Sequence, residues 1–257
     1  FFFFFFSGIG DIAADFDYSL LLPKIKSINN KSDLYKKLVK FNQVDGVILT
    51  EPKLNDVRIN YLKSKNIPFV SLGRIYEDDE IYWVDGDNIN GAYQATEDLI
   101  EKGHQKIACI AGGTELISSH TRLKGYKQAL LDYNLTFNPR WIARGDLTKQ
   151  GGYLAMKELL AKNVSFTAVF VINDLMAIGA IQALKEEGIK IPDECAVIRF
   201  NGIDLGTYIE PTLSTVKQPI YELGKQTANM LIKLIKNEEI ENKHQILPVK
   251  VILRDSS

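Results

Sequence analysis

Ala168-Val169-Phe170-Val171-Ile172-Asn173-Asp174-Leu175-Met176-Ala177-Ile178-Gly179-Ala180 is the stretch that decides the fold. An apolar run ends abruptly in two polar residues and then resumes with helical spacing, which predicts a buried strand followed by a helix. In a parallel sheet, such a strand delivers its first polar residue to the carboxyl edge, where open α/β sheets bind ligands. Asn173 is therefore the first candidate for a ligand contact.

The composition favours two α/β lobes over one large domain. The chain has 257 residues, of which 46% are hydrophobic, and this is enough for two cores. Its 31 Lys and Arg residues nearly balance its 32 Asp and Glu residues, so there is no global basic field to hold nucleic acid. No stretch approaches the ~18 apolar residues that a membrane span needs.

Cysteine usage suits a reducing cytoplasm. Cys109 and Cys195 lie in or beside apolar runs, and we expect both to be buried free thiols rather than a disulfide. The run from Phe1 to Phe6 has no basic flank and no small-residue cleavage site, so we do not interpret it as a signal peptide.

Strands and helices are predicted to alternate along the chain, which implies right-handed crossovers and parallel sheets. The last helix and the strands after it can contribute to both lobes. Strands are expected at 18–22, 46–50, 68–72, 107–111, 141–144, 168–172, 196–200, 246–247 and 249–253, and helices at 1–17, 32–41, 55–65, 88–102, 122–133, 149–161, 174–187 and 220–237.

Known enzyme motifs are missing from the sequence. It has no phosphate loop, no dinucleotide-binding glycine motif, no nucleophile elbow, no zinc-protease motif and no Cys-x-x-Cys. His104, His120 and His244 fall in separate segments without the spacing of metal ligands. We therefore expect no enzymatic activity, no catalytic residues, no cofactor and no metal.

Polar or glycine residues follow four of the predicted strands. In two lobes whose carboxyl edges face one another, all four strand ends would line a single cleft. Amide side chains donate and accept hydrogen bonds at once, and a guanidinium adds a planar fork of donors, so this set suits a neutral, hydroxyl-rich ligand. The strand ends are Leu72 before Gly73 and Arg74, Ala111 before Gly112, Ile172 before Asn173 and Asp174, and Phe200 before Asn201 and Gly202.

Each candidate also has a purely structural interpretation. Asn173 could cap its helix, and Asn201 could be a turn residue before Gly202. Arg122 would lie in the first turn of a helix over 122–133, where the helix dipole disfavours a cation, so it calls for a ligand or a buried carboxylate. His104, at a helix end, is interpreted as a structural contact rather than a catalytic base.

Six motifs, in this order and spacing, resemble the LacI/GalR transcriptional regulators over nearly the whole chain. The resemblance implies an effector-binding core with the fold of periplasmic sugar-binding proteins. The motifs are Asp45-Gly46-Val47-Ile48-Leu49, Ile67-Pro68-Phe69-Val70, Gly103-His104-Gln105-Lys106-Ile107-Ala108, Arg122-Leu123-Lys124-Gly125-Tyr126, Asn173-Asp174-Leu175-Met176-Ala177-Ile178-Gly179-Ala180 and Leu213-Ser214-Thr215-Val216-Lys217-Gln218-Pro219.

The resemblance also implies a domain organisation. An N-terminal lobe would comprise residues 1–87 and 219–247, and a C-terminal lobe residues 88–218 and 248–257. Three chain crossings near Asp87, Gln218 and Pro248 would form a hinge. The helix-turn-helix head of the family and the first strand of its N-terminal lobe are absent from this sequence, so operator DNA would be bound through a further N-terminal domain.

Site residues can be carried over from the family position by position. Its ligand-contacting arginine falls on Arg122 and its strand-end asparagine on Asn173. Its ligand-binding aspartate is replaced by Asn201, within Arg199-Phe200-Asn201-Gly202, where Gly-Phe-Asp-Asp is commoner. A family aromatic that packs on the sugar is replaced by Leu147. Gly73 stands where some members carry a ligand-binding acid, and Arg74 and Gln218 complete the candidate set.

The implied function is that of a cytoplasmic, homodimeric repressor whose hinge closes on a sugar and changes its affinity for DNA. Motifs around Ser71-Leu72-Gly73-Arg74, Val84-Asp85-Gly86-Asp87-Asn88 and Phe200-Asn201 resemble maltose-type regulators, which favours an α-glucoside or malto-oligosaccharide, while purines and pentoses stay open. The alternative is an exported sugar-binding protein that feeds a transporter. Gly103-His104-Gln105-Lys106-Ile107 and Leu247-Pro248-Val249 favour the regulator.

Overall fold

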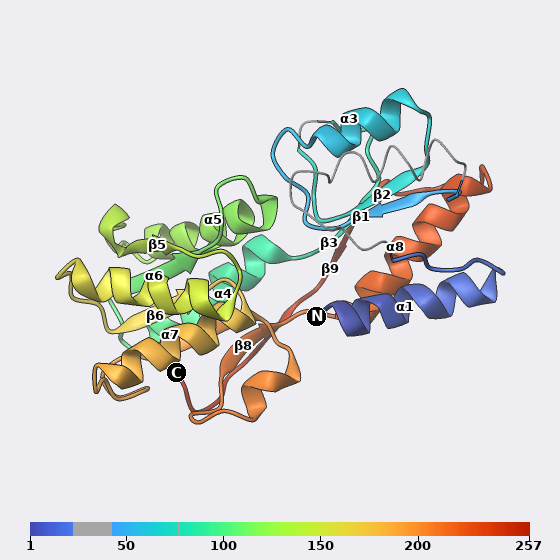
Figure 1. Cartoon of the computed structure of the whole chain (residues 1–257). Coiled ribbons are helices and arrows are strands. Elements are labelled where there is room, and N and C mark those ends of the chain that lie inside the picture. Colours follow the sequence, from blue (N-terminus) through green and yellow to red (C-terminus); the bar gives the residue numbers. More distant parts are fainter. Residues whose placement is uncertain (23–42, 77) are drawn as a thin grey trace. The chain divides into compact units, whose positions relative to one another are not determined.

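The computed structural model describes residues 1–22, 43–76 and 78–257, and the chain folds into two compact units (Figure 1). Unit 1 comprises Phe1–Gly86 and Pro219–Leu247, and unit 2 comprises Asp87–Gln218 and Pro248–Ser257. The chain therefore passes from one unit to the other three times. No helix within the described ranges is long and apolar enough to cross a membrane.

Unit 2 is built on a six-stranded sheet in the order β10-β8-β7-β6-β4-β5. All neighbouring strands pair in parallel except β10, which pairs antiparallel with β8. The carboxyl ends of the five parallel strands therefore share one edge of the sheet. The strands are β4 (Ile107–Ala111), β5 (Ile142–Arg144), β6 (Ala168–Val171), β7 (Ala196–Asn201), β8 (Ser214–Lys217) and β10 (Lys250–Ile252).

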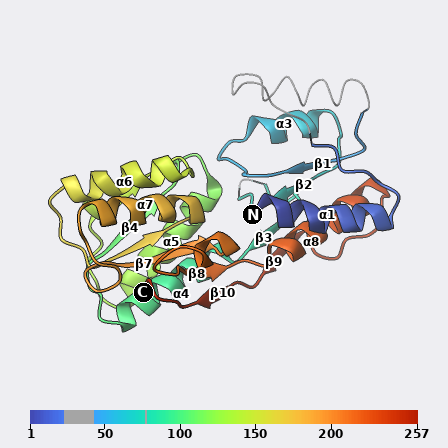
Figure 2. The ribbon, with the colours of Figure 1, turned by 60° about the horizontal axis from the view of Figure 1, so that its bottom comes forward.

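Two pairs of helices cover this sheet, one pair on each face, as Figure 2 shows. One pair is α4 (Asn88–Glu101) with α5 (Ile117–Asp132), and the other is α6 (Lys149–Ala161) with α7 (Asp174–Glu186). Glycine permits the close crossing within each pair, because a Cβ at Gly125 would overlap the backbone of α4 and a Cβ at Gly179 would overlap that of α6. Short 3₁₀ helices lie at Pro139–Trp141 (η2) and Asp204–Thr207 (η3).

The core of unit 2 explains why its strands are continuous apolar runs. Every residue of β4 and β6 is buried, because helices cover both faces of the sheet. Cys109 and Cys195 are buried free thiols, as predicted, and burial raises the pKa of each to about 12. The Tyr126 hydroxyl donates to the Ile107 carbonyl at 2.7 Å, so the buried oxygen of this tyrosine has a hydrogen-bond partner.

Unit 1 contains a parallel sheet in the order β1-β2-β3-β9. Helix α1 (Phe2–Asp15) packs on α8 (Ile220–Ile235), which in turn packs on the sheet. Close approach of these helices requires Gly8 and Gly224, since a Cβ at either position would overlap backbone atoms of the other helix. The remaining elements are β1 (Val47–Leu49), α3 (Val57–Ser64), β2 (Phe69–Leu72), β3 (Trp83–Gly86) and β9 (His244–Leu247).

The expected elements need several corrections. The strand over 18–22 is wrong, because these residues have no strand partner and leave Leu20, Leu21 and Leu22 exposed. Strands β3 and β8 were not predicted, since each mixes polar residues into a short buried segment. Helix α5 begins at Ile117, five residues before the expected start, and its N-cap Leu116 makes no side-chain capping bond. The helix expected over 32–41 lies outside the described residues.

Candidate ligand-binding site in unit 2

Arg122 is the central charged group at the carboxyl edge of the sheet in unit 2. Its side chain is buried, with 7% of the residue exposed. Nε donates to Asn88 Oδ1 at 2.7 Å, and Nη1 donates to the Ile172 carbonyl at 2.5 Å, where β6 has just ended. The guanidinium carbon lies 3.9 Å from the centre of the Phe200 ring. Contacts from α4, β6 and β7 therefore hold this cation in one orientation.

The local reason for this cation differs from the one expected. Arg122 lies in the second turn of α5, because the helix begins at Ile117, so the penalty of a cation in a first turn does not apply. Its contacts in unit 2 include an amide oxygen, a carbonyl and an aromatic face. These contacts fix the orientation of a planar fork of donors, which suits a ligand with electron-rich oxygens.

Asn173 is the N-cap of α7. Its Oδ1 accepts from the Met176 amide at 2.9 Å, and its Nδ2 donates to the Leu147 carbonyl at 2.9 Å. The structural interpretation of this asparagine is thus confirmed. The neighbouring Asp174 pairs with a nearby cation, Arg199. Because Asn173 is only half-buried, one amide can hold the loop and still face solvent.

Leu147 lies in the loop between β5 and α6 with a φ of 68°. A left-handed conformation is unusual for leucine and marks local backbone strain. The preceding Asp146 accepts from the Thr148 amide at 3.0 Å and from its hydroxyl at 2.6 Å, and these bonds lower the pKa of the Asp146 carboxyl. The loop therefore presents an aliphatic side chain and a carbonyl that Asn173 binds.

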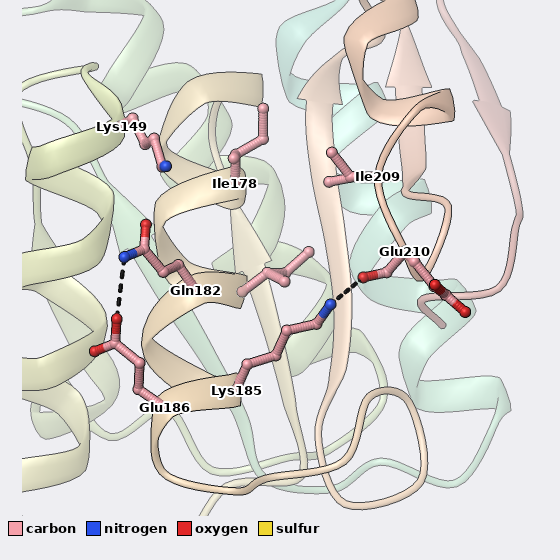
Figure 3. A pocket seen from close by; sticks show the side chains of 8 residues that line it. Lys149, Ile178, Gln182, Lys185, Glu186, Ile209 and Glu210 are labelled. Atoms are coloured by element: carbon pink, nitrogen blue, oxygen red, sulfur yellow. Dashed lines mark hydrogen bonds between the residues drawn. The ribbon is translucent and has the colours of Figure 1, made fainter.

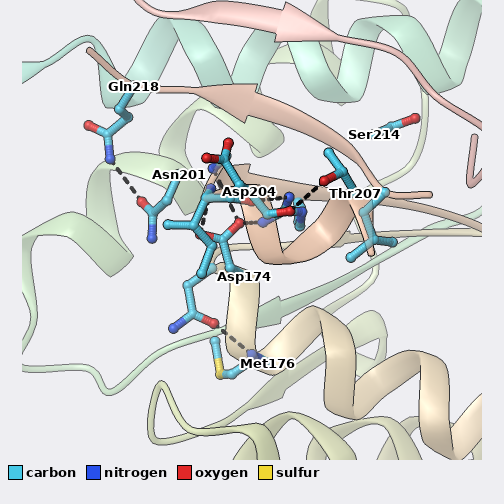
Figure 4. A network of polar contacts seen from close by, with 12 residues as sticks. Asp174, Met176, Asn201, Asp204, Thr207, Ser214 and Gln218 are labelled. Carbon is cyan, nitrogen blue, oxygen red and sulfur yellow. Dashed lines mark hydrogen bonds and ion pairs between the residues drawn. The ribbon is translucent and has the colours of Figure 1, made fainter. Parts of the chain in front are cut away.

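Asn201 ends β7 in a left-handed conformation, with a φ of 93°. Figure 4 shows Gln218 Nε2 donating to Asn201 Oδ1, at 2.8 Å. The backbone amide of Gln218 also donates to the backbone carbonyl of Asn201 at 3.1 Å, and Gln218 is buried. Asn201 is thus held on both its backbone and its side chain.

Gly73 and Arg74 belong to unit 1. Gly73 has a φ of 114° at the end of β2, a conformation that favours glycine, and its amide donates to the Val84 carbonyl at 2.8 Å. Arg74 Nε lies 3.4 Å from Asp85 Oδ2, and its guanidinium carbon is 5.7 Å from the centre of the Trp83 ring. Of the seven candidate residues, the structure places five in unit 2 and these two in unit 1.

Sequence reasoning missed three contributors to the edge in unit 2. Asn88 is the first residue of α4 and directly follows its N-cap, Asp87. This position at a helix start was the signal that could have indicated Asn88. Phe200 ends an apolar run in the sequence, and its ring lies in the core while it also supports Arg122. The pair of Arg199 and Asp174 joins two segments that no local pattern connects.

Chemically, the edge offers amide groups, a buried guanidinium and backbone carbonyls. Within the described ranges, no three or more His, Cys, Asp and Glu residues gather in a way that could hold a metal ion. Groups that both donate and accept are suited to sugar hydroxyls, and a planar cation adds directed donors to ring or hydroxyl oxygens.

Comparisons with known proteins point in the same direction. The family model described as a periplasmic binding protein-like domain matches residues 96–257. The HTH-type transcriptional repressor CytR of Escherichia coli K12 is 33% identical over 252 residues, which cover 97% of this chain and 73% of CytR.

Solved structures are similar over almost the entire chain. The transcriptional regulator CelR in complex with cellobiose has a TM-score of 0.94 and 30% identity, covering 99% of this chain and 78% of CelR. A LacI family transcriptional regulator from Enterococcus faecium with bound ribose has a TM-score of 0.84 and 32% identity, covering 100% of this chain and 93% of that one. The α/β architecture with parallel sheets is thus shared with regulators that were crystallised with sugars.

Proposed function

This chain belongs to the LacI family of transcriptional regulators, and we propose that it is the part of such a regulator that binds a small carbohydrate and dimerises. The observation that carries the proposal is Arg122, a buried cation that contacts from three elements hold in one orientation at the carboxyl edge of unit 2. Asn173 and Asn201 end two neighbouring strands at the same edge. In this proposal Arg122, Asn173 and Asn201 contact the sugar, and Leu147 packs on its apolar face.

The chemistry of the edge supports a neutral ligand over an acid. Two amides can donate and accept hydrogen bonds in the manner that vicinal hydroxyls need, and the arginine adds donors alone. The candidate acid of the family is an amide here, at Asn201, so the site has one ionised acceptor fewer. Gln218 orients Asn201, and Gly73 and Arg74 are proposed as contributions from unit 1.

An α-glucoside or malto-oligosaccharide is the proposed effector class. Three short motifs support it. The CelR structure was solved with cellobiose, which supports a disaccharide of glucose but not the α linkage, because cellobiose is β-linked. The regulator with bound ribose keeps a pentose as the competing ligand.

We further propose that the sugar binds one arrangement of the two units better and so shifts the population of arrangements, which changes affinity for operator DNA. A domain outside this sequence would bind that DNA, in the cytoplasm.

Isothermal titration with maltose, cellobiose, ribose and hypoxanthine tests the ligand. We expect maltose to bind, and Arg122→Ala to weaken its binding by about 1.5–3 kcal/mol, because a charge-assisted hydrogen bond is lost. Arg140→Ala is the matched control, since Arg140 also donates to a carbonyl, that of Lys162 at 2.5 Å, but lies before β5 at the opposite edge. Equal affinity in Arg122→Ala and the wild type would contradict the site, and preference for ribose or hypoxanthine would contradict the sugar class.

A surface groove on unit 2 supports the proposed homodimer. The groove is open and has a volume of about 510 Å³ (Figure 3). Tyr208, which directly precedes the lining residue Ile209 in the chain, is 82% exposed. The charged residues of the groove are two lysines and two glutamates, so opposite charges can pair when two copies of this face meet across a two-fold axis. The lining residues are Lys149, Ile178, Ile181, Gln182, Lys185, Glu186, Ile209 and Glu210.

The oligomeric state tests this surface directly. We expect the wild-type chain to elute as a dimer in size-exclusion chromatography with light scattering, and Ile178→Glu to elute as a monomer, because an unpaired charge would be buried in the interface. Leu131→Glu is the control, since Leu131 is 67% exposed on α5, outside the groove. A monomeric wild type, or a dimer in which Ile178→Glu has no effect, would contradict the assignment.

A further inference from the structure

Arg199 is the largest completely buried side chain in the described part of the molecule. It lies in β7, paired in register with Val171 of β6 and Thr215 of β8. Its guanidinium forms an ion pair with Asp174, the first residue of α7, which is 2% exposed. Nη2 also donates to the Ile203 carbonyl at 2.9 Å. A full positive and a full negative charge are therefore enclosed where β7 and α7 meet.

The loop after β7 is wrapped around this ion pair. Asp174 Oδ1 accepts from the Gly202 amide at 3.2 Å, and Oδ2 accepts from the Ile203 amide at 3.3 Å. Gly206 has room only for hydrogen, since a Cβ there would overlap the Arg199 guanidinium. Figure 4 shows Asp174 surrounded by these contacts, with Asn201 and Gln218 beside them. The course of the chain over 202–206 therefore depends on both charges.

The same ion pair adjoins the candidate ligand contacts on each side. Asp174 directly follows Asn173, so its carboxylate restrains the backbone that carries this amide. Arg199 is separated from Asn201 by Phe200 alone, the residue whose ring supports Arg122. Displacing either charge would move a strand end that carries a proposed sugar contact.

Stability alone is a weak reason for such a pair. A buried ion pair contributes little net free energy of folding compared with apolar residues of similar size, because two charges must leave water. Burial, together with the nearby Arg254, lowers the pKa of the Arg199 guanidinium to about 10, which leaves it protonated at neutral pH. Within the described residues, its Nε has no hydrogen-bond acceptor. The pair is thus better explained by the geometry that it imposes.

We propose that Arg199 and Asp174 are positioning residues for sugar binding, which set the backbone at Asn173 and Asn201 without touching the ligand. The geometric part of this inference concerns the chain alone. The part that concerns affinity rests on the proposed function, and the two parts need separate measurements.

Amide hydrogen exchange without any ligand tests the geometric part. In Arg199→Met we expect the Gly202 and Ile203 amides to exchange at least about tenfold faster relative to the Ala196 and Val197 amides. The latter two bond to the Thr167 and Ser256 carbonyls at the other end of β7 and therefore report global opening. Equal acceleration at all four amides would mean that Arg199 only stabilises the fold, and would overturn the proposal.

Maltose titration, beside urea unfolding, tests the part that concerns affinity. We expect Arg199→Met to raise the Kd for maltose by about tenfold or more, and Arg199→Lys to recover part of that loss by keeping the charge near Asp174. Arg140→Met is the control, with a normal Kd whatever its stability. An unchanged Kd in Arg199→Met, in a protein that binds maltose, would overturn this part.

Two further variants guard against a failure to fold. The double variant Arg199→Met/Asp174→Asn buries neither charge of the pair. Its Kd for maltose and its amide exchange at Gly202 and Ile203 should therefore lie between the values of the wild type and those of the single variants. Gly206→Ala should displace the guanidinium while keeping both charges, and should speed exchange at Gly202 and Ile203. A Gly206→Ala protein with normal exchange at both amides would contradict the proposal. If the wild type binds no sugar, the proposed function fails, and the ligand-free exchange still decides the geometric part.

Discussion

The two edges of the sheet in unit 2 both carry polar side chains and left-handed residues, but they use them differently. At the amino edge, Gly103, Asn134, Asn163 and Gly188 have positive φ, and each directly follows the C-cap of a helix. This is the ordinary way for a helix to end. At the carboxyl edge the positive φ values fall on Leu147, Asn201 and Gly202, where no helix ends.

Charge separates the two edges in the same way. At the amino edge, His104 Nδ1 lies 2.9 Å from Thr167 Oγ1, and Lys106 Nζ donates to Ser165 Oγ at 3.0 Å, both as exposed contacts. At the carboxyl edge, Arg122, Asp174 and Arg199 are buried. Strain and buried charge have a cost, and they occur together on the side where open α/β sheets bind ligands. The amino edge thus closes the fold, whereas the carboxyl edge carries the proposed site.

The largest expected difference between the edges comes from exchanging one arginine on each for lysine. Arg122→Lys keeps the charge but cannot reach Asn88, the Ile172 carbonyl and the Phe200 face together, so we expect sugar affinity to fall by roughly tenfold or more. Arg140→Lys should leave affinity unchanged. Calorimetric titration of both variants measures the contrast, and equal losses would remove it.

Asparagine caps give the next largest effect. Asn173→Ala removes the cap of α7 and should lower the free energy of unfolding by about 1 kcal/mol, together with sugar affinity. Asn173→Asp keeps the acceptor for the Met176 amide but loses the donor to the Leu147 carbonyl, so it should keep the stability and still lose affinity.

The matched cap at the amino edge is Asn138, whose Oδ1 accepts from the Arg140 amide at 3.0 Å. Asn138→Ala should affect stability alone in urea unfolding and titration. If Asn173→Asp bound sugar as the wild type does, Asn173 would be a cap and nothing more.

The helix ends of the amino edge should affect stability alone, so their total effect is smaller than that of Asn173→Ala, which also lowers affinity. Asn134 has a φ of 58°, which alanine adopts less readily, so Asn134→Ala should lower the free energy of unfolding by about 1 kcal/mol. Asn134→Gly should be close to neutral. Neither variant should alter sugar affinity, and a change in Kd for either would blur the distinction between the edges.

The smallest effect is a pH dependence at His104. Burial, with a further contribution from the charge of Lys102, lowers the pKa of this imidazole below its ordinary value of 6.5. The unfolded chain then binds more protons than the folded chain just below pH 6.5, so stability should rise with pH through that range and level off above it. His104→Gln should flatten the slope in urea unfolding followed across this range. An equal slope in the variant would assign the dependence to other groups.

Much of the fold follows from local patterns in the sequence. The strand over 107–111 and the helix over 149–161 have the predicted bounds, because each is an unbroken apolar run or an amphipathic segment with a polar cap. Prediction failed where burial comes from the partners of a strand, as in β8, whose residues Ser214 and Thr215 are polar yet buried. The direction of β10 depends on where the chain re-enters unit 2, which no local pattern encodes.

The candidate site was predictable in part. Family motifs indicated Arg122, Asn173 and Asn201, and the structure brings all three to one edge of unit 2. The contacts that orient them join residues far apart in the chain: Asn88 and Arg122 are 34 positions apart, and Asp174 and Arg199 meet only after two strands have paired. Local periodicity carries no information about such pairs, so sequence reasoning could name the site but not its support.

Hydrogen exchange with and without saturating sugar tests the central claim, that the carboxyl edge of unit 2 is the binding site. The sugar is the member of the titrated panel that binds with the greatest affinity. The account predicts slower exchange on binding in segments 145–149, 172–176 and 200–204, and no change in segments 103–106, 134–139 and 163–167. Protection confined to the segments of the amino edge, or an equal change at both edges, would contradict it.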